Sequence, residues 1–314
     1  MARAPMQTQP TSPASRRFVI APPVPFRLVE VVRSHGWVEL APWRWDGAVL
    51  ARRERIDGIA GELTIRQTES GRVVVTWSAA KGAEGPLPAL PHALRARGRV
   101  TKRAVLAVVG RVLSWDWDHA PFCALAQGLA PAAAAQIEGG AGRLLRGTSF
   151  YEDFVKTVCT INTSWAGTRK MTANLVARLG RGRFPTPRQI LRAGEAGLRE
   201  TCRLGFRAPV LIGCTERLLD DGAIDARGHG AADALGYDYL VALKGIGPYA
   251  AAHCRVLLHD FSRLPVDSVV GAHLREALAL TDEAAIEAHF APWGAYRFLA
   301  YRLHRNAARA AAGW

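Results

Sequence analysis

The spacing of apolar residues changes once along this 314-residue chain, from the period of a β-strand to that of an α-helix. Residues 61–67 (GELTIRQ) and 71–77 (GRVVVTW) alternate between apolar and polar side chains, and the turn residues 69–71 between them predict a β-hairpin. Residues 82–90, rich in Gly and Pro, predict a linker or a strand crossover. From Gln136 onward the apolar spacing is close to the ~3.6 residues of a helical turn, which predicts helices almost throughout.

These patterns divide the chain into three expected parts. Residues 1–17 are rich in Pro, Gln, Ser and Thr, a composition typical of a disordered tail. Residues 18–135 predict a domain that combines an antiparallel β-sheet with helices. Residues 136–314 predict a helical domain, so the expected fold class is α+β. Within the first domain, helices are expected over residues 94–113 and 122–135.

A glycine turn opens one of the expected helices. Gly245, Ile246 and Gly247 allow a tight backbone turn, and Pro248 fits the first turn of the helix that follows. Backbone N–H groups at the positive end of such a helix can bind a phosphate, and Lys244 just before the turn would also meet one. A Gly-x-Gly sequence alone is more often a simple turn, so its surroundings must decide.

Asp267 follows Gly247 by 20 residues (267 minus 247). Pro265 before it and the β-branched Val269 and Val270 after it place its carboxylate at the start of a helix. There it either caps the helix or faces a cleft, and for the residue taken alone capping is favoured.

Residues 240–270, LVALKGIGPYAAAHCRVLLHDFSRLPVDSVV, resemble the core of the helix-hairpin-helix DNA glycosylases. The resemblance implies that the hairpin holds the DNA backbone and that Asp267 is the catalytic carboxylate. It covers most of residues 143–303. The family's mixed β-sheet domain followed by a helical core agrees with the α+β class that the patterns predict.

Two further segments resemble parts of this family that contact DNA. Residues 143–171 resemble the helix and turn that fill the space left by a flipped base, with Asn162 at that place. Residues 203–209, RLGFRAP, resemble a loop of the 8-oxoguanine glycosylases, so Phe206 matches its wedge and Arg207 its reader of the opposite base. Structural roles remain open, with Phe206 as a core residue and Asn162 as a helix cap.

Tyr249 decides the subclass that the resemblance implies. Relatives that also cut the strand use a lysine amine near the start of this helix as a Schiff-base nucleophile, which a phenol cannot replace. The resemblance therefore implies a monofunctional enzyme in which water is the nucleophile and Asp267 stabilises the positive charge that develops on the sugar. A lysine from elsewhere, such as Lys156 or Lys170, remains an open alternative.

The expected base pocket contains Tyr249, which can stack on the extruded base, and His35 or Trp37 from the N-terminal domain. The alternative for these two is a seam between the sheet and the helices. Phe298 and Arg302 fall where 8-oxoguanine glycosylases have a glutamine and a phenylalanine, which disfavours oxidised guanine. An aromatic at position 249 favours alkylated purines, because a cationic ring stacks well on an electron-rich one. Hypoxanthine, a deaminated purine, is a further expected substrate.

Two alternative functions remain open. One is an 8-oxoguanine-type glycosylase. The other is a non-catalytic helix-hairpin-helix protein that binds damaged DNA and uses the hairpin only to hold the backbone. Asp267 discriminates between enzyme and binder, because a pure binder has no need of a carboxylate facing an anionic backbone.

Composition adds a strong positive charge to this picture. The net charge of +14 and the pI near 10.3 are typical of a polyanion binder, and the expected partner is double-stranded DNA containing a damaged base. The five cysteines are scattered without a Cys-x-x-Cys pair, so no metal site or disulfide framework is expected. The expected chemistry requires no cofactor. Without a signal peptide or an apolar run of about 18 residues, we expect a cytoplasmic protein associated with the bacterial nucleoid. Because glycosylases of this type need only one chain, the resemblance implies a monomer.

Overall fold

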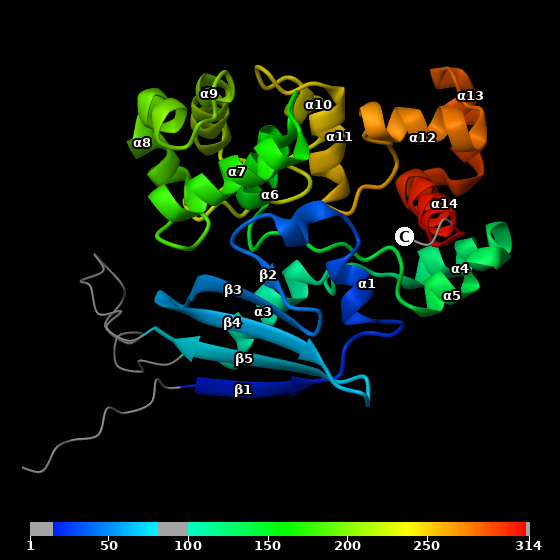
Figure 1. The fold of residues 1–314 in the computed structure, drawn as a ribbon, viewed down its shortest axis with the longest axis horizontal. Helices are drawn as coiled ribbons and strands as arrows, with labels where there is room; N and C mark the ends of the chain where they lie inside the picture. Colours follow the sequence, from blue (N-terminus) through cyan, green and yellow to red (C-terminus); the bar gives the residue numbers. More distant parts are fainter. Residues whose placement is uncertain (1–14, 81–99, 312–314) are drawn as a thin grey trace, which may run out of the picture.

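The computed structural model describes residues 15–80 and 100–311, and it places a β-sheet against a larger group of helices (Figure 1). The described strands form one five-stranded antiparallel sheet in the order β1-β5-β4-β3-β2. Their bounds are β1 Ser15–Ile20, β2 Arg44–Trp45, β3 Val49–Ile56, β4 Ile59–Gln67 and β5 Val73–Ala79. The expected α+β class is confirmed.

The predicted hairpin is formed by β4 and β5. Ile65 pairs with Val75 in the antiparallel register, and the N–H of Thr68 donates to the carbonyl of Arg72 at 2.8 Å across the turn. Gly71 has a φ of +79°, in the left-handed region that favours glycine. The turn residues therefore determine both the position and the register of this hairpin.

Strand β1 corrects the expected end of the N-terminal tail. Residues 15–17 belong to β1, which pairs with β5 and places Phe18 opposite Val75. The local sequence of such a short strand, beside a Pro-rich segment, gives only a weak signal for β-structure. Its pairing with β5 therefore decides its conformation. Residues 1–14 and the expected linker at 82–90 lie outside the described residues.

Helices form most of the remaining described chain. In the N-terminal half they are α1 Leu28–Val32, the 3-10 helix η1 Gly36–Glu39, α3 Lys102–Val112, α4 Ala120–Leu129, the 3-10 helix η2 Pro131–Ala133 and α5 Ala134–Glu138. They continue with α6 Phe150–Thr160, α7 Trp165–Asn174, the π-helix η3 Leu175–Leu179, α8 Pro187–Glu200 and α9 Arg207–Asp220. The last are α10 Tyr237–Val241, α11 Pro248–Val256, α12 Ser268–Leu278, α13 Glu283–Phe290, the 3-10 helix η4 Ala291–Tyr296 and α14 Arg297–Ala311.

The two helices expected in the N-terminal domain have different bounds in the structure. The first begins only at Lys102, where the hydroxyl of Thr101 accepts a hydrogen bond from the N–H of Ala104. The part of that expectation from residue 94 to 99 lies outside the described residues. The second is interrupted after Leu129, because Pro131 disfavours a helical residue before it. Between residues 136 and 311 the structure contains no strand, as expected.

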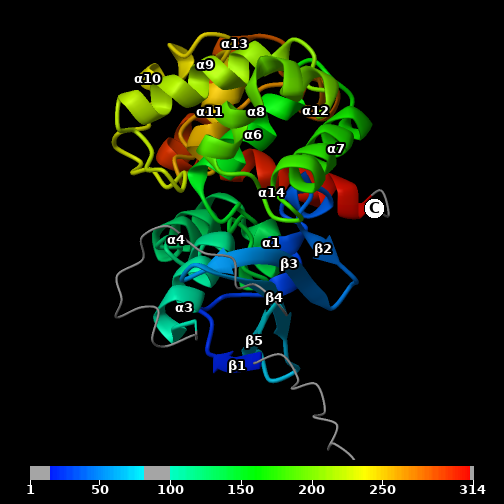
Figure 2. The ribbon, with the colours of Figure 1, turned by 90° about the vertical axis from the view of Figure 1, so that its left-hand side faces the viewer.

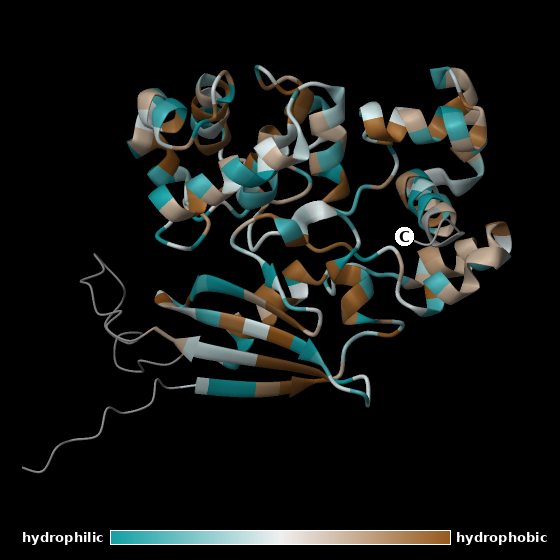
Figure 3. Ribbon diagram, viewed as in Figure 1, coloured by the Kyte–Doolittle hydropathy of each residue, from teal (hydrophilic) through white to brown (hydrophobic). Residues whose placement is uncertain are grey.

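Two hydrophobic cores hold these elements together. The first joins the sheet and helices α1, α3, α4 and α5 with the C-terminal helices, and it contains Trp77, Phe122, Phe261 and Tyr301. The second lies within residues 150–254. Figure 2 shows the helices around α11 standing above the sheet, with α3 and α4 beside the strands, and Figure 3 shows apolar and polar residues alternating along the strands. The expected domain boundary between residues 135 and 136 remains a prediction.

A buried ionic contact joins the sheet to the helices. Glu152 on α6 accepts hydrogen bonds from Nη1 (3.1 Å) and Nη2 (2.8 Å) of Arg52 on β3, and from the Nζ of Lys156 (2.8 Å). All three side chains are buried. Burial raises the pKa of Glu152, but the charges of Arg52 and Lys156 outweigh it and hold this pKa well below the ordinary range.

Removing this carboxylate should strongly destabilise the protein. We expect Glu152→Gln to lower the free energy of unfolding by about 3–5 kcal/mol, because the buried ammonium of Lys156 would lose its ion-pair partner and Arg52 would keep only Glu54. Urea unfolding measures the change. The control is Glu195→Gln, which breaks an exposed pair with Arg199 and should cost less than about 0.5 kcal/mol. Equal midpoints for the two variants would contradict the structural role of Glu152.

Candidate active site

The hairpin between α10 and α11 has the geometry that its glycines predict. Gly245 has a φ of +86°, and an added Cβ would lie 2.7 Å from Val210, so a larger residue does not fit. Ile246 is 4% exposed and anchors the hairpin in the second core. Gly247 precedes α11 without a side-chain cap, and Lys244 is exposed beside it. The first N–H groups of α11 are thus suited to an anion.

Asp267 is the N-cap of α12, as favoured for the residue alone. Its Oδ1 accepts a hydrogen bond from the N–H of Val270 at 2.8 Å. The same carboxylate also acts on α11: burial raises the pKa of Tyr249, and the negative charge of Asp267 adds to that increase. Capping and a position beside α11 are therefore compatible, because the cap bond engages one of the two carboxylate oxygens.

The aromatic residues expected in the base pocket form one cluster. Tyr249 stacks on His253, with ring centroids 5.9 Å apart, and His253 lies 5.0 Å from Trp37. Trp37 in turn stacks on His35 at 4.8 Å. Trp37 is only 2% exposed, and its indole N–H donates to Asp153 at 2.9 Å. Trp37 therefore matches the seam alternative, while His35 and Tyr249 are partly exposed.

The two imidazoles of this cluster are held in the neutral form. Burial lowers the pKa of His253 to about 4, although the charge of Asp267 opposes this. Burial, and then the neighbouring His253 and Arg302, lower the pKa of His35. The Nε2 atoms of both rings are buried without a hydrogen-bond partner among the described residues. Leaving such buried polar atoms without a hydrogen bond costs free energy.

A cavity of about 400 Å³ opens between α11, α12 and α13. Tyr249 and Pro248 line it from α11, and Val266, the neighbour of Asp267, lines it from the loop before α12. Neither His35 nor Trp37 is among its lining residues. This volume lies within the roughly 300–1,000 Å³ of pockets that hold small molecules, so Tyr249 is one wall of a space large enough for a base.

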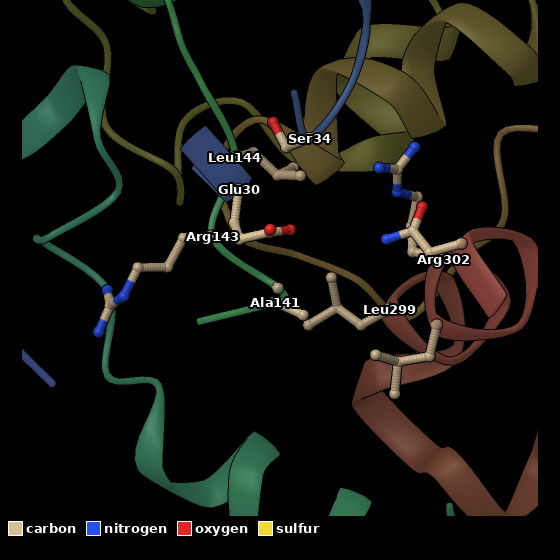
Figure 4. Close-up of a pocket in the computed structure, with 10 residues that line it drawn as sticks. Glu30, Ser34, Ala141, Arg143, Leu144, Leu299 and Arg302 are labelled. Atoms are coloured by element: carbon tan, nitrogen blue, oxygen red, sulfur yellow. The ribbon is translucent and has the colours of Figure 1, made fainter. Parts of the chain in front are cut away.

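A second pocket, between α1 and α14, is much smaller at about 20 Å³. Figure 4 shows Glu30 and Arg302 on opposite sides of this pocket and Arg143 pointing away from it. A volume near 15 Å³ is enough for about one water molecule. This pocket is too small for a base. Arg302, which lines it, also carries a charge that lowers the pKa of His35.

The two residues expected to fill and wedge the DNA are both exposed. Phe206 is 51% exposed, so it is not a core residue. Asn162 lies in a turn with a φ of +48°, and the cap of the following helix is Ser164 instead. Arg207, the expected reader of the opposite base, is only 7% exposed, and its guanidinium contacts the backbone of the Asn162 turn.

The lysines left open by the sequence differ in accessibility. Lys156 is buried and paired with Glu152. Lys170 is exposed on α7. Among the described residues, no group of three or more His, Cys, Asp or Glu side chains could hold a metal ion.

Sequence reasoning missed His253 as a member of the cluster. It lies four residues after Tyr249 on α11, so the two rings share one helix face. That spacing is the signal that could have found it. Phe298, noted for the lesion preference, is buried and stacks on Phe261 at 6.3 Å, so it belongs to the first core.

Solved structures share this fold. The 3-methyladenine DNA glycosylase from Archaeoglobus fulgidus matches with a TM-score of 0.67 and 19% identity, over 91% of this chain and 97% of that one. The 8-oxoguanine glycosylase/lyase from Clostridium acetobutylicum, in complex with double-stranded DNA containing cytosine opposite 8-oxoG, matches with a TM-score of 0.57 and 14% identity, over 86% and 99% of the two chains. Its apo-form also has a TM-score of 0.57, with 15% identity over 85% and 98%.

These matches confirm the resemblance to the helix-hairpin-helix DNA glycosylases at the level of the fold. No protein-family model and no curated protein sequence matches the chain. Within the described ranges, no helix has the length and apolar character needed to span a membrane.

The lowered pKa of His253 predicts a pH-dependent stability. Because its pKa falls from 6.5 to about 4 on folding, its neutral form stabilises the fold fully above pH 6.5, and this contribution is lost as the pH falls towards 4. We expect His253→Gln to reduce the loss of unfolding free energy between pH 7 and pH 4.5 by at most about 3 kcal/mol. Urea unfolding at both pH values measures it. An unchanged pH dependence in the variant would contradict the burial of this imidazole.

Proposed function

We propose that this chain is a monofunctional DNA glycosylase of base-excision repair. It would bind double-stranded DNA containing a damaged base, flip that base out of the helix and hydrolyse its N-glycosidic bond without cutting the strand. The observation that carries the proposal is the position of Asp267, fixed by its cap bond at the start of α12 and electrostatically coupled to Tyr249 on α11. The shared fold supports it.

The hairpin supplies the binding half of the proposed function. Gly245 permits the tight turn before α11, Gly247 leaves the start of α11 open, and Lys244 adds a positive charge beside it. A DNA phosphate at this place would receive backbone N–H groups without any contact to a base. The net charge of +14 favours the encounter with DNA as a whole. The reaction needs one chain only, so we expect a monomer to be active.

Asp267 supplies the chemical half. As the bond between C1′ and the base nitrogen breaks, its electron pair leaves with the base and positive charge develops on the sugar. A carboxylate beside the sugar stabilises this transition state more than the ground state. The oxygen of a water molecule then bonds to C1′, and Asp267 can orient this water and accept its proton.

The surroundings of Tyr249 favour an alkylated or deaminated purine as the base. An aromatic ring attracts a cationic base through its π-electrons. The imidazoles of His35 and His253 are neutral at physiological pH, so they do not repel such a base. An alkylated purine also leaves more easily, because departure neutralises its charge. The 8-oxoguanine alternative is less favoured, since Phe298 and Arg302 replace the residues that clasp that base.

Asp267→Asn tests the catalytic assignment. Because Asn caps a helix as well as Asp does, the variant should fold and bind DNA normally, while single-turnover excision should fall by about 100-fold or more. The assay uses end-labelled duplexes that contain an alkylated purine or hypoxanthine. The control is Asp46→Asn, which removes an exposed carboxylate that accepts two backbone N–H bonds, and excision should stay within about threefold.

Unchanged excision by Asp267→Asn would refute the role of this carboxylate. If the wild-type protein binds lesion DNA but excises none of the tested bases, the chain is a DNA-damage-binding protein instead. Excision of 8-oxoguanine alone would support the alternative enzyme class.

The absence of a lysine at position 249 predicts that strand breaks appear only after treatment with hot alkali. Borohydride should trap no covalent adduct between wild-type protein and DNA, because a phenol forms no Schiff base. A glycosylase/lyase treated in parallel verifies the trapping conditions. A trapped adduct would contradict the monofunctional assignment, and its loss in Lys170→Gln would identify the exposed lysine as the nucleophile.

A further inference from the structure

The guanidinium of Arg207 is largely occupied by backbone carbonyls. Its Nε–H donates to Ile161 at 3.0 Å, and its Nη2 donates both to Ile161 and, at 3.1 Å, to Asn162. Its Nη1 donates to Leu204 at 3.4 Å. A guanidinium has five N–H donors in total, and these bonds use four of them. A bidentate contact to a base needs two donors, so Arg207 cannot make one in this conformation.

The same side chain connects the two exposed residues that meet the DNA in the proposed complex. The ring of Phe206 lies against the guanidinium, with 4.4 Å between the guanidinium carbon and the ring centroid. The carbonyl of Asn162 accepts a hydrogen bond from Nη2 of the same guanidinium. Phe206 and Asn162 come from segments 44 residues apart (206 minus 162), and Arg207 contacts both.

The contacts of Arg207 with the Phe206 ring and with the Asn162 carbonyl restrict the positions of these two residues. Hydrogen bonds from a charged donor are stronger than neutral ones, and Arg207 is nearly excluded from solvent, at 7% exposed. Asn162 has a φ of +48°, a conformation that needs support from its surroundings. The guanidinium supplies that support on the carbonyl side of the turn.

We propose that Arg207 is a positioning residue that holds Phe206 and Asn162 as one unit, and that the protein consequently recognises a lesion with little regard for the opposite base. This inference rests on the proposed function, because it assumes that Phe206 and Asn162 enter the DNA. It assigns to Arg207 a role different from that of the matching residue in the 8-oxoguanine glycosylases. Specificity then comes from the extruded base alone.

Binding to an abasic analogue tests the proposal without any excision step. Duplexes that carry a tetrahydrofuran residue opposite A, C, G or T have no base pair to break, so differences in affinity report contacts to the opposite base. Fluorescence anisotropy should give dissociation constants within about threefold of one another for the wild-type protein. A preference of tenfold or more for any one opposite base in the wild-type protein would overturn the proposal, since a bidentate contact discriminates by roughly 5-fold to 150-fold.

Arg207→Ala should weaken binding by a similar factor, about tenfold, opposite all four bases. With 2-aminopurine as the opposite base, wild-type binding should raise its fluorescence by unstacking it, and both Arg207→Ala and Phe206→Ala should reduce this rise. Arg207→Lys should recover only part of the signal, because an ammonium lacks the planar fork. Arg199→Ala, which removes an exposed arginine paired with Glu195, should change neither affinity nor fluorescence.

A double-mutant cycle separates positioning from independent contacts. Asn162→Gly removes the amide at a positive φ without adding strain. If Arg207 acts through this turn, the effects of Arg207→Ala and Asn162→Gly on binding should be less than additive. Full additivity would contradict the proposal.

The outcomes for this inference and for the proposed function are distinguishable. A protein that excises no base but shows uniform affinity and the predicted fluorescence changes would retain the positioning role and lose the catalytic one. If Arg207→Ala does not fold, the wild-type series over the four opposite bases still decides the proposal.

Discussion

Two adjacent buried carboxylates on α6 determine how the sheet and the helices are arranged. Glu152 binds the guanidinium of Arg52 from β3, and Asp153 accepts the indole N–H of Trp37 from η1 and, at 2.8 Å, a bond from Arg111 on α3. A buried charge that loses its partner is far more costly than an exposed one. Three separate segments are thereby fixed to one helix turn, and Trp37 is held where it contacts His253. The position of the aromatic cluster thus depends on the hydrogen bond between Trp37 and Asp153, which lies outside the proposed site.

The start of α12 resolves an electrostatic conflict in the proposed site. A carboxylate beside a DNA backbone is repelled by the phosphates, yet the reaction requires its negative charge near the sugar. As an N-cap, Asp267 lies at the positive end of the α12 dipole, and its carboxylate accepts the N–H of Val270 at 2.8 Å. In the proposed complex, a DNA phosphate would bind at the start of the other helix, α11, where Gly247 adds no side chain. In the proposed reaction, the start of α11 would therefore bind the phosphate, and the start of α12 would hold the catalytic carboxylate.

The sequence correctly predicted those features that depend on residues close together in the chain. The hairpin of β4 and β5 follows from alternation and from Gly71, and the capping role of Asp267 follows from its place before β-branched residues. Arg207 shows the limit of such reasoning. Phe206 and Arg207 are adjacent and match the same motif, but successive residues at a helix start point about 100° apart, so one is exposed and the other is buried. The carbonyls that the Arg207 guanidinium contacts belong to a segment 44 residues earlier than Phe206 (206 minus 162). The local sequence around Arg207 therefore cannot predict these contacts.

The two proposals support each other through the chemistry of the lesion. An alkylated purine differs from a normal purine by its positive charge, so the base itself carries the information needed to select it, both in stacking on Tyr249 and in leaving the sugar. Inspection of the opposite base adds nothing to that selection. A neutral lesion that pairs with more than one base gives no such signal and requires a reader on the opposite strand. In this structure the guanidinium at the reader's place is bound to the carbonyls of Ile161 and Asn162, which is the arrangement that selection by charge permits.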